Sequence, residues 1–337
     1  MSKMPTLIRK RISEFAAYAK TATIQEPLNF YAITNASGAE IVFRDMYPPL
    51  HAAGAIDYFF FAMVHNYGFW TDDGEKYVSP LFGKWKEKTG VKGSDLLWKM
   101  LCAAWQKDNA CLAPERLATI SDTDFAAMFS DDDGPVELFM TPERLDLTRN
   151  YGKWFRTPRW WGVRSPSELV SYANDYEDAV HVLREILTHP ENGVPAFRED
   201  PLGKKAELLL MALANRPEKY LRRGINEGWR PIVDYHDMRL TLRLGHVTLP
   251  KEWADENTAR KITTHEREEA IRNATYKADA LLIKESGRTR DEIDILKWSA
   301  RTFCPEMVTP NCSACLFQDV CAKRVLLFQP VLRTTHY

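Results

Sequence analysis

The chain has 337 residues, a formal net charge of −1 and 45% hydrophobic residues, so it can bury a large core without covalent help. The balanced charge excludes an overall field that attracts polyanions, and any nucleic-acid surface must be a local patch. The N-terminus lacks a signal-peptide pattern, and no apolar run is long enough to span a membrane. We therefore expect an intracellular, cytoplasmic monomer with no membrane partner and with reduced thiols.

Helical periodicity dominates the first third of the chain. Residues 5–20 place apolar side chains on one stripe, after a proline suited to a first helical turn. Residues 56–70 are apolar and aromatic over a length that exceeds a typical strand, and predict a buried helix ending near Gly68. Residues 94–108 predict an amphipathic helix with Ser94 as its N-cap.

Later segments continue this pattern, and strand signals are few. The predicted class is therefore an all-α protein with at most minor β structure. We divide it into an N-terminal helical region (1–140), a central helical region (141–250) and a C-terminal region (251–337), and expect the first and last to pack together. Further helices are expected at 121–129, 165–189 and 203–215, and strands at 39–43 and around 231–235.

Four of the six cysteines fall within residues 304–321, with the spacing C-x7-C-x2-C-x5-C. Reduced thiols disfavour disulfides, and four thiolates can hold either zinc or a four-iron cluster. Zinc sites usually contain two well-separated Cys-x2-Cys pairs. Here only Cys312 and Cys315 form such a pair, flanked by Cys304 and Cys321, so we favour a [4Fe–4S] cluster and keep zinc as the alternative.

This spacing carries a family resemblance. The segment KWSARTFCPEMVTPNCSACLFQDVC (297–321) resembles the end of endonuclease III-type DNA glycosylases, of the helix-hairpin-helix superfamily, with one extra residue in the first interval. The resemblance implies a two-lobed helix-hairpin-helix bundle closed by a C-terminal iron–sulfur loop. It also implies that the cluster is structural and that the substrate base is rotated out of DNA.

Two upstream segments resemble the same superfamily, LGKKAELLLMAL (202–213) and PIVDYHDMRLTLRLGHV (231–247). The resemblance places Asp234 at the catalytic aspartate and Lys205 at the nucleophilic lysine of the bifunctional members. The family's Gly-apolar-Gly hairpin is reduced here to Pro201-Leu202-Gly203, and about eleven extra residues separate the lysine from the aspartate.

Physical chemistry supports Asp234 as a catalytic carboxylate, because it can stabilise an oxocarbenium ion and orient water. The alternative is a helix N-cap or a partner for Arg239. Asp237 is the rival carboxylate. His236 is either a proton relay, a phosphate contact or a structural histidine.

The central region is locally basic, with nine Lys and Arg against five Asp and Glu over residues 201–250. This surplus suits either a phosphate backbone or a solvated face. We assign phosphate contacts to Lys204, Arg239 and Arg243. Lys205 is either a Schiff-base nucleophile or a second phosphate contact.

An aromatic and acidic segment stands in the N-terminal region. IDYFFFAMVHNYGFWTDDGEKY (56–77) loosely resembles queuosine-nucleotide N-glycosylases, which suggests a base pocket of Phe69, Trp70, Asp72 and Asp73. The alternative is a helix end followed by a solvated acidic turn. WFRTPRWWG (154–162) suits base stacking or ordinary packing.

These features predict a nucleobase-processing enzyme, a glycosylase-like hydrolase of the N-glycosidic bond acting on a modified base in DNA. Three alternatives stay open. The first is group transfer on a 5-hydroxymethyluracil-type base, as in helical proteins of phage DNA-hypermodification systems. The second is hydrolysis of a free modified nucleotide, and the third is a non-catalytic reader of modified bases.

Overall fold

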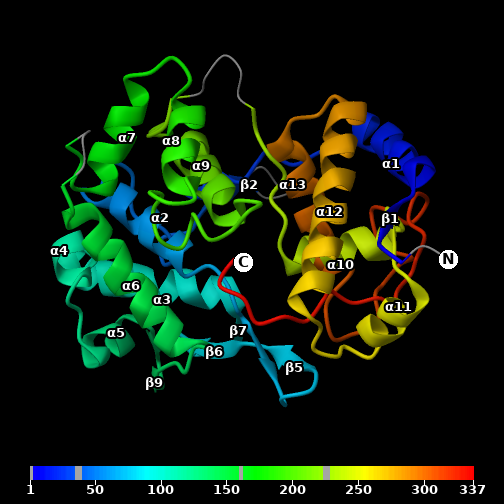
Figure 1. The fold of residues 1–337 in the computed structure, drawn as a ribbon, viewed down its shortest axis with the longest axis horizontal. Helices are drawn as coiled ribbons and strands as arrows, with labels where there is room; N and C mark the ends of the chain where they lie inside the picture. The colour runs from blue at the N-terminus through cyan, green and yellow to red at the C-terminus, as the bar shows by residue number, and fades with distance from the viewer. Residues whose placement is uncertain (1–2, 35–39, 159–161, 223–227) are drawn as a thin grey trace. The chain divides into compact units, whose positions relative to one another are not determined.

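The computed structural model describes residues 3–34, 40–158, 162–222 and 228–337. Across these residues the chain is mostly helical, with 13 α-helices, 48% helix and only short strands (Figure 1). The predicted helical class is thereby confirmed. Among the described helices, none combines the length and apolar character that crossing a bilayer requires.

The chain forms two compact units, each discontinuous in sequence. Unit 1 contains residues 1–27, 71–79 and 229–333, and unit 2 contains residues 28–70, 80–228 and 334–337. The sequence analysis had instead divided the chain into three consecutive regions. The two divisions differ because residues 1–27 and 71–79 group with residues 229–333, whereas residues 334–337 group with unit 2.

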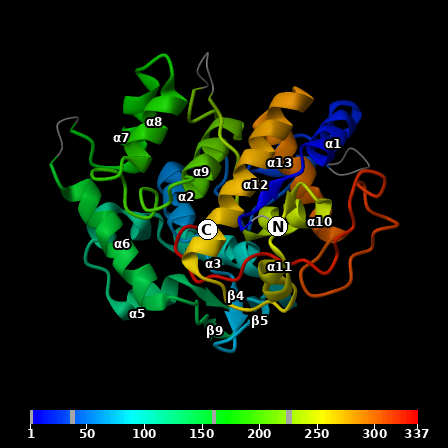
Figure 2. The ribbon, with the colours of Figure 1, turned by 45° about the vertical axis from the view of Figure 1, so that its right-hand side comes forward.

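Unit 1 is built around a long helix, α12, against which α1 and α10 pack (Figure 2). The buried face of α1 contains Ile12 and Phe15, and the Phe15 ring meets the Phe317 ring edge-on at 4.9 Å. The N-terminal helix therefore covers part of the cysteine-bearing segment. The helices of unit 1 are α1 (Arg9–Thr21), α10 (Tyr235–Leu244), α11 (Lys251–Thr258), α12 (His265–Ser286), α13 (Arg290–Ser299) and the 3-10 turn η2 (Ala300–Thr302), and its paired strands are β1 (Thr6–Leu7) and β10 (Val247–Thr248).

Unit 2 has the apolar helix α2 at its centre, in contact with α3, α7 and α9. A buried ion pair between Arg184 and Glu207 links α8 to α9. The helices of unit 2 are α2 (Ala55–Val64), α3 (Gly93–Lys107), the 3-10 turn η1 (Asn109–Leu112), α4 (Pro114–Leu117), α5 (Asp122–Met128), α6 (Thr141–Arg156), α7 (Pro166–Asn174), α8 (Ala179–Thr188) and α9 (Lys204–Asn215).

The strands other than β1 and β10 form separate two-stranded hairpins. One of them, β4–β5, includes residues 71–79 of unit 1. The strands are β2 (Ala32–Thr34), β3 (Glu40–Val42), β4 (Trp70–Asp72), β5 (Tyr77–Pro80), β6 (Phe82–Trp85), β7 (Lys88–Lys92), β8 (Ser130–Asp131) and β9 (Gly134–Pro135).

Several predicted boundaries were wrong. The first helix begins at Arg9, because Thr6 and Leu7 pair with β10 in place of forming a first turn. Ser94 is not an N-cap, since α3 already begins at Gly93. The helix expected at 165–189 is interrupted between Asn174 and Ala179.

Two further predictions concern segments of the candidate site. Residues 231–235 form no strand, and α10 begins at Tyr235. The helix expected to end near Gly68 ends at Val64. By contrast, the strand predicted at 39–43 is observed as β3 over its described part.

The early end of α2 has a physical cause. The carbonyls of residues 64–67 accept hydrogen bonds from three buried cations in place of helical amides. Lys205 Nζ donates to Val64 O at 3.3 Å. Lys204 Nζ donates to Asn66 O at 3.1 Å, and the Arg144 guanidinium donates to the carbonyls of His65 and Tyr67.

Candidate functional site

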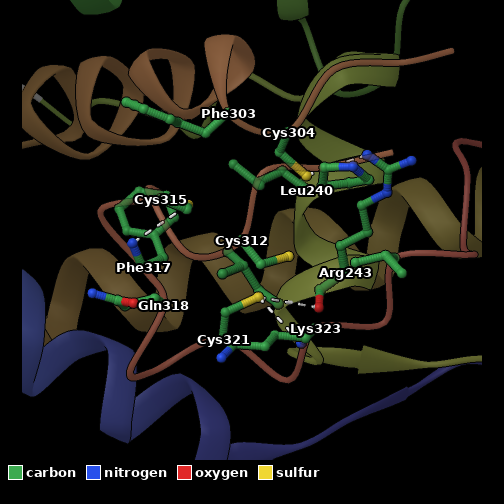
Figure 3. Close-up of a pocket in the computed structure, with 13 residues that line it drawn as sticks. Leu240, Arg243, Phe303, Cys304, Cys312, Cys315, Phe317, Gln318, Cys321 and Lys323 are labelled. Atoms are coloured by element: carbon green, nitrogen blue, oxygen red, sulfur yellow. Dashed lines mark hydrogen bonds between the residues drawn. The ribbon is translucent and has the colours of Figure 1, made fainter. Parts of the chain in front are cut away.

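The four clustered cysteines line one cavity in unit 1 (Figure 3). The segment that carries them, residues 304–321, contains no helix or strand, and its sulfur atoms surround a common space beside α10. The cavity measures about 20 Å³, which is room for roughly one water molecule. Lining residues besides the cysteines include Leu240, Arg243, Leu244, Phe303, Pro310 and Phe317.

Hydrogen-bond donors point at three of the sulfur atoms. Arg243 Nη1 donates to Cys304 Sγ at 3.2 Å. The backbone amide of Lys323 donates to Cys321 Sγ at 3.3 Å, and that of Phe317 to Cys315 Sγ at 3.5 Å. Such donors stabilise thiolates and tune the groups that thiolates hold.

The cysteines of this loop raise the pKa of their neighbours' thiol groups. Burial and the other cysteines raise the pKa of Cys315 and of Cys321. A bound cation or cluster would offset this cost, because metal-bound thiols are deprotonated. Within the described residues, no three His, Cys, Asp or Glu side chains are grouped tightly enough for one metal ion. Four sulfurs with amide and guanidinium donors nevertheless form a donor set suited to a thiolate-held group.

Helix α10 connects this cavity to the predicted catalytic carboxylate. Leu240, Arg243 and Leu244 of α10 line the cysteine cavity, while Asp234 is the N-cap at the other end of the helix. A helix of this length spans about 15 Å.

Asp234 is half-buried and caps α10 through its Oδ1, which accepts from Asp237 N at 3.0 Å. No other hydrogen bond of its carboxylate is found within the described ranges. The preceding residue is fixed because Arg272 Nε donates to Val233 O at 3.1 Å. The capping alternative is therefore observed, and it leaves the second carboxylate oxygen available for chemistry.

A second carboxyl group lies close to Asp234 and was missed in the sequence analysis. Burial raises the pKa of Asp294 to about 7, and the carboxylates of Asp291 and Asp234 add to this rise. Asp294 can thus hold a proton near neutral pH beside the Asp234 carboxyl group, as in pairs of carboxyl groups that share acid and base roles. The spacing of Asp291, Asp294 and Lys297 by three residues on α13 could have indicated a common face.

Asp237, the rival of Asp234, belongs to a buried ion network. Lys297 Nζ contacts Asp279 Oδ1 at 2.6 Å, Thr241 Oγ1 at 2.9 Å and the Asp237 carboxylate. Burial and Asp279 raise the pKa of Asp237, and Lys297 opposes this rise. The network ties α10, α12 and α13 together, which is a structural role.

Two of the predicted phosphate contacts need correction. Arg239 is buried, with Nη1 donating to Gln329 Oε1 at 2.8 Å and lying 3.6 Å from Glu306 Oε1. His236 Nδ1 lies 2.6 Å from Arg239 Nη2. Arg243 is also buried and contacts Cys304, as described above. Neither arginine presents its charge to solvent, so both act inside unit 1.

The two lysines at the start of α9 are also buried, in unit 2. The phosphate-contact prediction does not fit them, because Lys204 and Lys205 are only 4% and 0% exposed. Burial lowers the pKa of Lys205 to about 7, and Asp200 and Glu199 partly oppose this shift. Its amine is therefore partly neutral at physiological pH, as a nucleophilic lysine requires.

The residues predicted to form a base pocket do not form one site within a unit. Phe69 and Trp70 are buried in unit 2. Asp72 lies in unit 1 and pairs with Arg333 at 2.7 Å, and Asp73 is exposed and accepts from the amides of a turn. The acidic-turn alternative describes these two carboxylates better.

The segment 154–162 is described only in part. Trp154 is buried, and its Nε1 donates to Asn192 O at 2.9 Å, which is a packing role. Arg159, Trp160 and Trp161 lie outside the described residues.

Neither a protein-family model nor a curated protein matches this chain.

Proposed function

We propose that this protein is a glycosylase-like enzyme that hydrolyses the N-glycosidic bond of a modified base in DNA. The observation that carries the proposal is the arrangement along α10. A half-buried carboxylate, Asp234, stands at one end near the weakly acidic Asp294, and four cysteines surround a cavity at the other.

The resemblance to the helix-hairpin-helix superfamily also receives support from unit 2. Helices α8 and α9 are consecutive and pack against each other. The segment between them ends at Gly203, whose φ of 66° is the left-handed conformation that glycine adopts readily. Asp200 Oδ2 accepts from Lys204 N at 2.7 Å and fixes the start of α9. These features suit a shortened hairpin.

In the proposed reaction, the Asp234 carboxylate stabilises the oxocarbenium ion that develops as the bond to the base breaks. It also orients the attacking water and accepts its proton. Asp294, with a pKa of about 7, can hold a proton beside Asp234 at neutral pH and share it during turnover. The Arg272 hydrogen bond to Val233 O positions this segment.

We propose that Cys304, Cys312, Cys315 and Cys321 hold a [4Fe–4S] cluster with a structural role, zinc being the alternative. When bound, the cluster would fix the loop against α10 and require no redox step. Arg243 would offset part of its negative charge through the contact with Cys304.

The reaction is tested by incubating the protein with a duplex that contains 5-hydroxymethyluracil and analysing bases and strands by mass spectrometry. We expect free base and abasic DNA. A mass increase on the base without abasic DNA would show that the reaction is group transfer and that hydrolysis is the wrong assignment. Binding alone would indicate a non-catalytic reader of modified bases. Base release only from the free nucleotide would show that the substrate is a nucleotide and not DNA.

The cluster is tested by purifying the protein anaerobically. We expect a broad absorption band at about 400 nm and about four iron atoms per chain. Cys312→Ser should lose both, because one thiolate ligand is removed. Cys111→Ser is the matched control and should keep them, since Cys111 lies in unit 2. A colourless protein with one zinc per chain would refute the cluster.

A further inference from the structure

Residues 334–337 belong to unit 2, whereas the residues just before them belong to unit 1. The segment is held closely. Thr334 and Tyr337 are 8% and 4% exposed, and the His336 amide donates to Thr334 Oγ1 at 3.1 Å. We call residues 334–337 the tail segment.

The tail segment covers the amine of Lys205. Lys205 Nζ donates to Thr335 O at 2.7 Å, a shorter hydrogen bond than the one to Val64 O. The lysine is fully buried. A main-chain carbonyl of the tail segment therefore occupies the place where an oxygen atom of a ligand could meet this amine.

A second buried polar group lies near Lys205. Lys205 Nζ is 5.0 Å from the centre of the Tyr67 ring. The Tyr67 hydroxyl is buried and has no hydrogen-bond partner within the part of the chain that the structure describes. Buried hydroxyls usually find a partner, so the Tyr67 hydroxyl is a polar group that an oxygen or nitrogen atom of a ligand could satisfy.

We propose that the tail segment is a displaceable plug, which shields the Lys205 amine in one state and exposes it in another. The tail segment contains no helix or strand, and such segments open at low free-energy cost compared with core helices, so the plug can leave without unfolding unit 2. The inference rests on unit 2 alone and does not depend on hydrolysis at Asp234.

The chemistry of Lys205 makes the exposed state detectable. Burial lowers the pKa of the covered amine to about 7, and this shift is lost once the amine meets solvent, so the uncovered lysine reacts as an ordinary lysine does. Once uncovered, a neutral amine condenses with formaldehyde, releasing water, and dimethylamine–borane reduces the resulting iminium ion to a methylamine.

The test compares the methylation rate of Lys205 at pH 7 in full-length variants, using peptide mass spectrometry. Tyr337→Ala removes a buried anchor of the tail segment and should raise the rate at Lys205 by about tenfold, as expected for a local opening favoured by about 1.4 kcal/mol. Tyr176→Ala is the matched control, because Tyr176 is an exposed tyrosine of the same unit.

Thr334→Val is a milder second variant that removes only the hydroxyl accepting from His336 N, and it should give a smaller rise. Melting followed by circular dichroism, together with the labelling of buried Lys297, reports general unfolding. The plug is refuted if both tail variants keep folded structure and label Lys205 at the wild-type rate. It is also refuted if wild-type Lys205 labels as fast as exposed lysines.

Discussion

Asp234→Asn is expected to reduce the rate of base release by about 10³-fold, because the neutral amide cannot stabilise an oxocarbenium ion. The same change should alter the free energy of unfolding by less than about 0.5 kcal/mol, since asparagine and aspartate are equally good N-caps. The hydrogen bond from Asp237 N to the side chain at 234 can be kept by the amide oxygen. The substitution therefore separates the catalytic role from the capping role.

Two further variants complete this comparison. Asp234→Ala removes both roles and should lose base release together with about 1 kcal/mol of stability. Asp178→Asn makes the same change at the N-cap of α8, where the side chain accepts from His181 N, and should leave base release intact. Full activity of Asp234→Asn would mean that Asp234 is a cap and nothing more.

The helices were predictable where one stripe of apolar residues decides the fold. The segment 94–108 became α3 with boundaries within one residue, because its buried side chains recur at helical spacing. The end of α2 was not predictable in this way. It depends on Lys204, Lys205 and Arg144, which come from distant parts of the sequence and bind the carbonyls of residues 64–67.

The same distinction applies to the candidate site. The cysteine spacing predicted that four thiols share one place, and they line one cavity. The role of Arg243 could not be predicted, because its contact with Cys304 joins residues 61 positions apart. The proposed base pocket shows the opposite error. Phe69, Trp70, Asp72 and Asp73 are adjacent in sequence, and yet the boundary between the two units passes through them.

Lys297→Met is expected to destabilise the protein by about 3–5 kcal/mol, because it leaves two buried carboxylates without their shared cation. Lys297 Nζ lies 2.6 Å from Asp279 Oδ1 and also contacts Asp237, so a single amine holds α10, α12 and α13 together. Methionine preserves the volume of the side chain, which makes the loss of charge the main effect. The measurement is urea unfolding followed by circular dichroism.

The loss of stability caused by Lys297→Met should depend on pH in a defined direction. Without the lysine, the folded-state pKa of Asp237, which burial already raises, rises further above its unfolded value, so the folded protein binds more protons. Stability is then lost as pH rises, and the deficit should be larger at pH 8 than at pH 5. Lys277→Met, at an exposed position of α12, should cost less than about 0.5 kcal/mol at either pH.

A further variant tests whether unpaired charge causes the loss of stability in Lys297→Met. Adding Asp237→Asn and Asp279→Asn to Lys297→Met removes both unpaired charges and should recover part of the loss of stability. The extra pH dependence that Lys297→Met introduces between pH 5 and pH 8 should disappear. The Asp237 amide remains available to the Asp234 cap, so the start of α10 is preserved. If Lys297→Met proves no less stable than Lys277→Met, the network does not hold the three helices, and Asp237 becomes free to compete with Asp234 as the catalytic carboxylate.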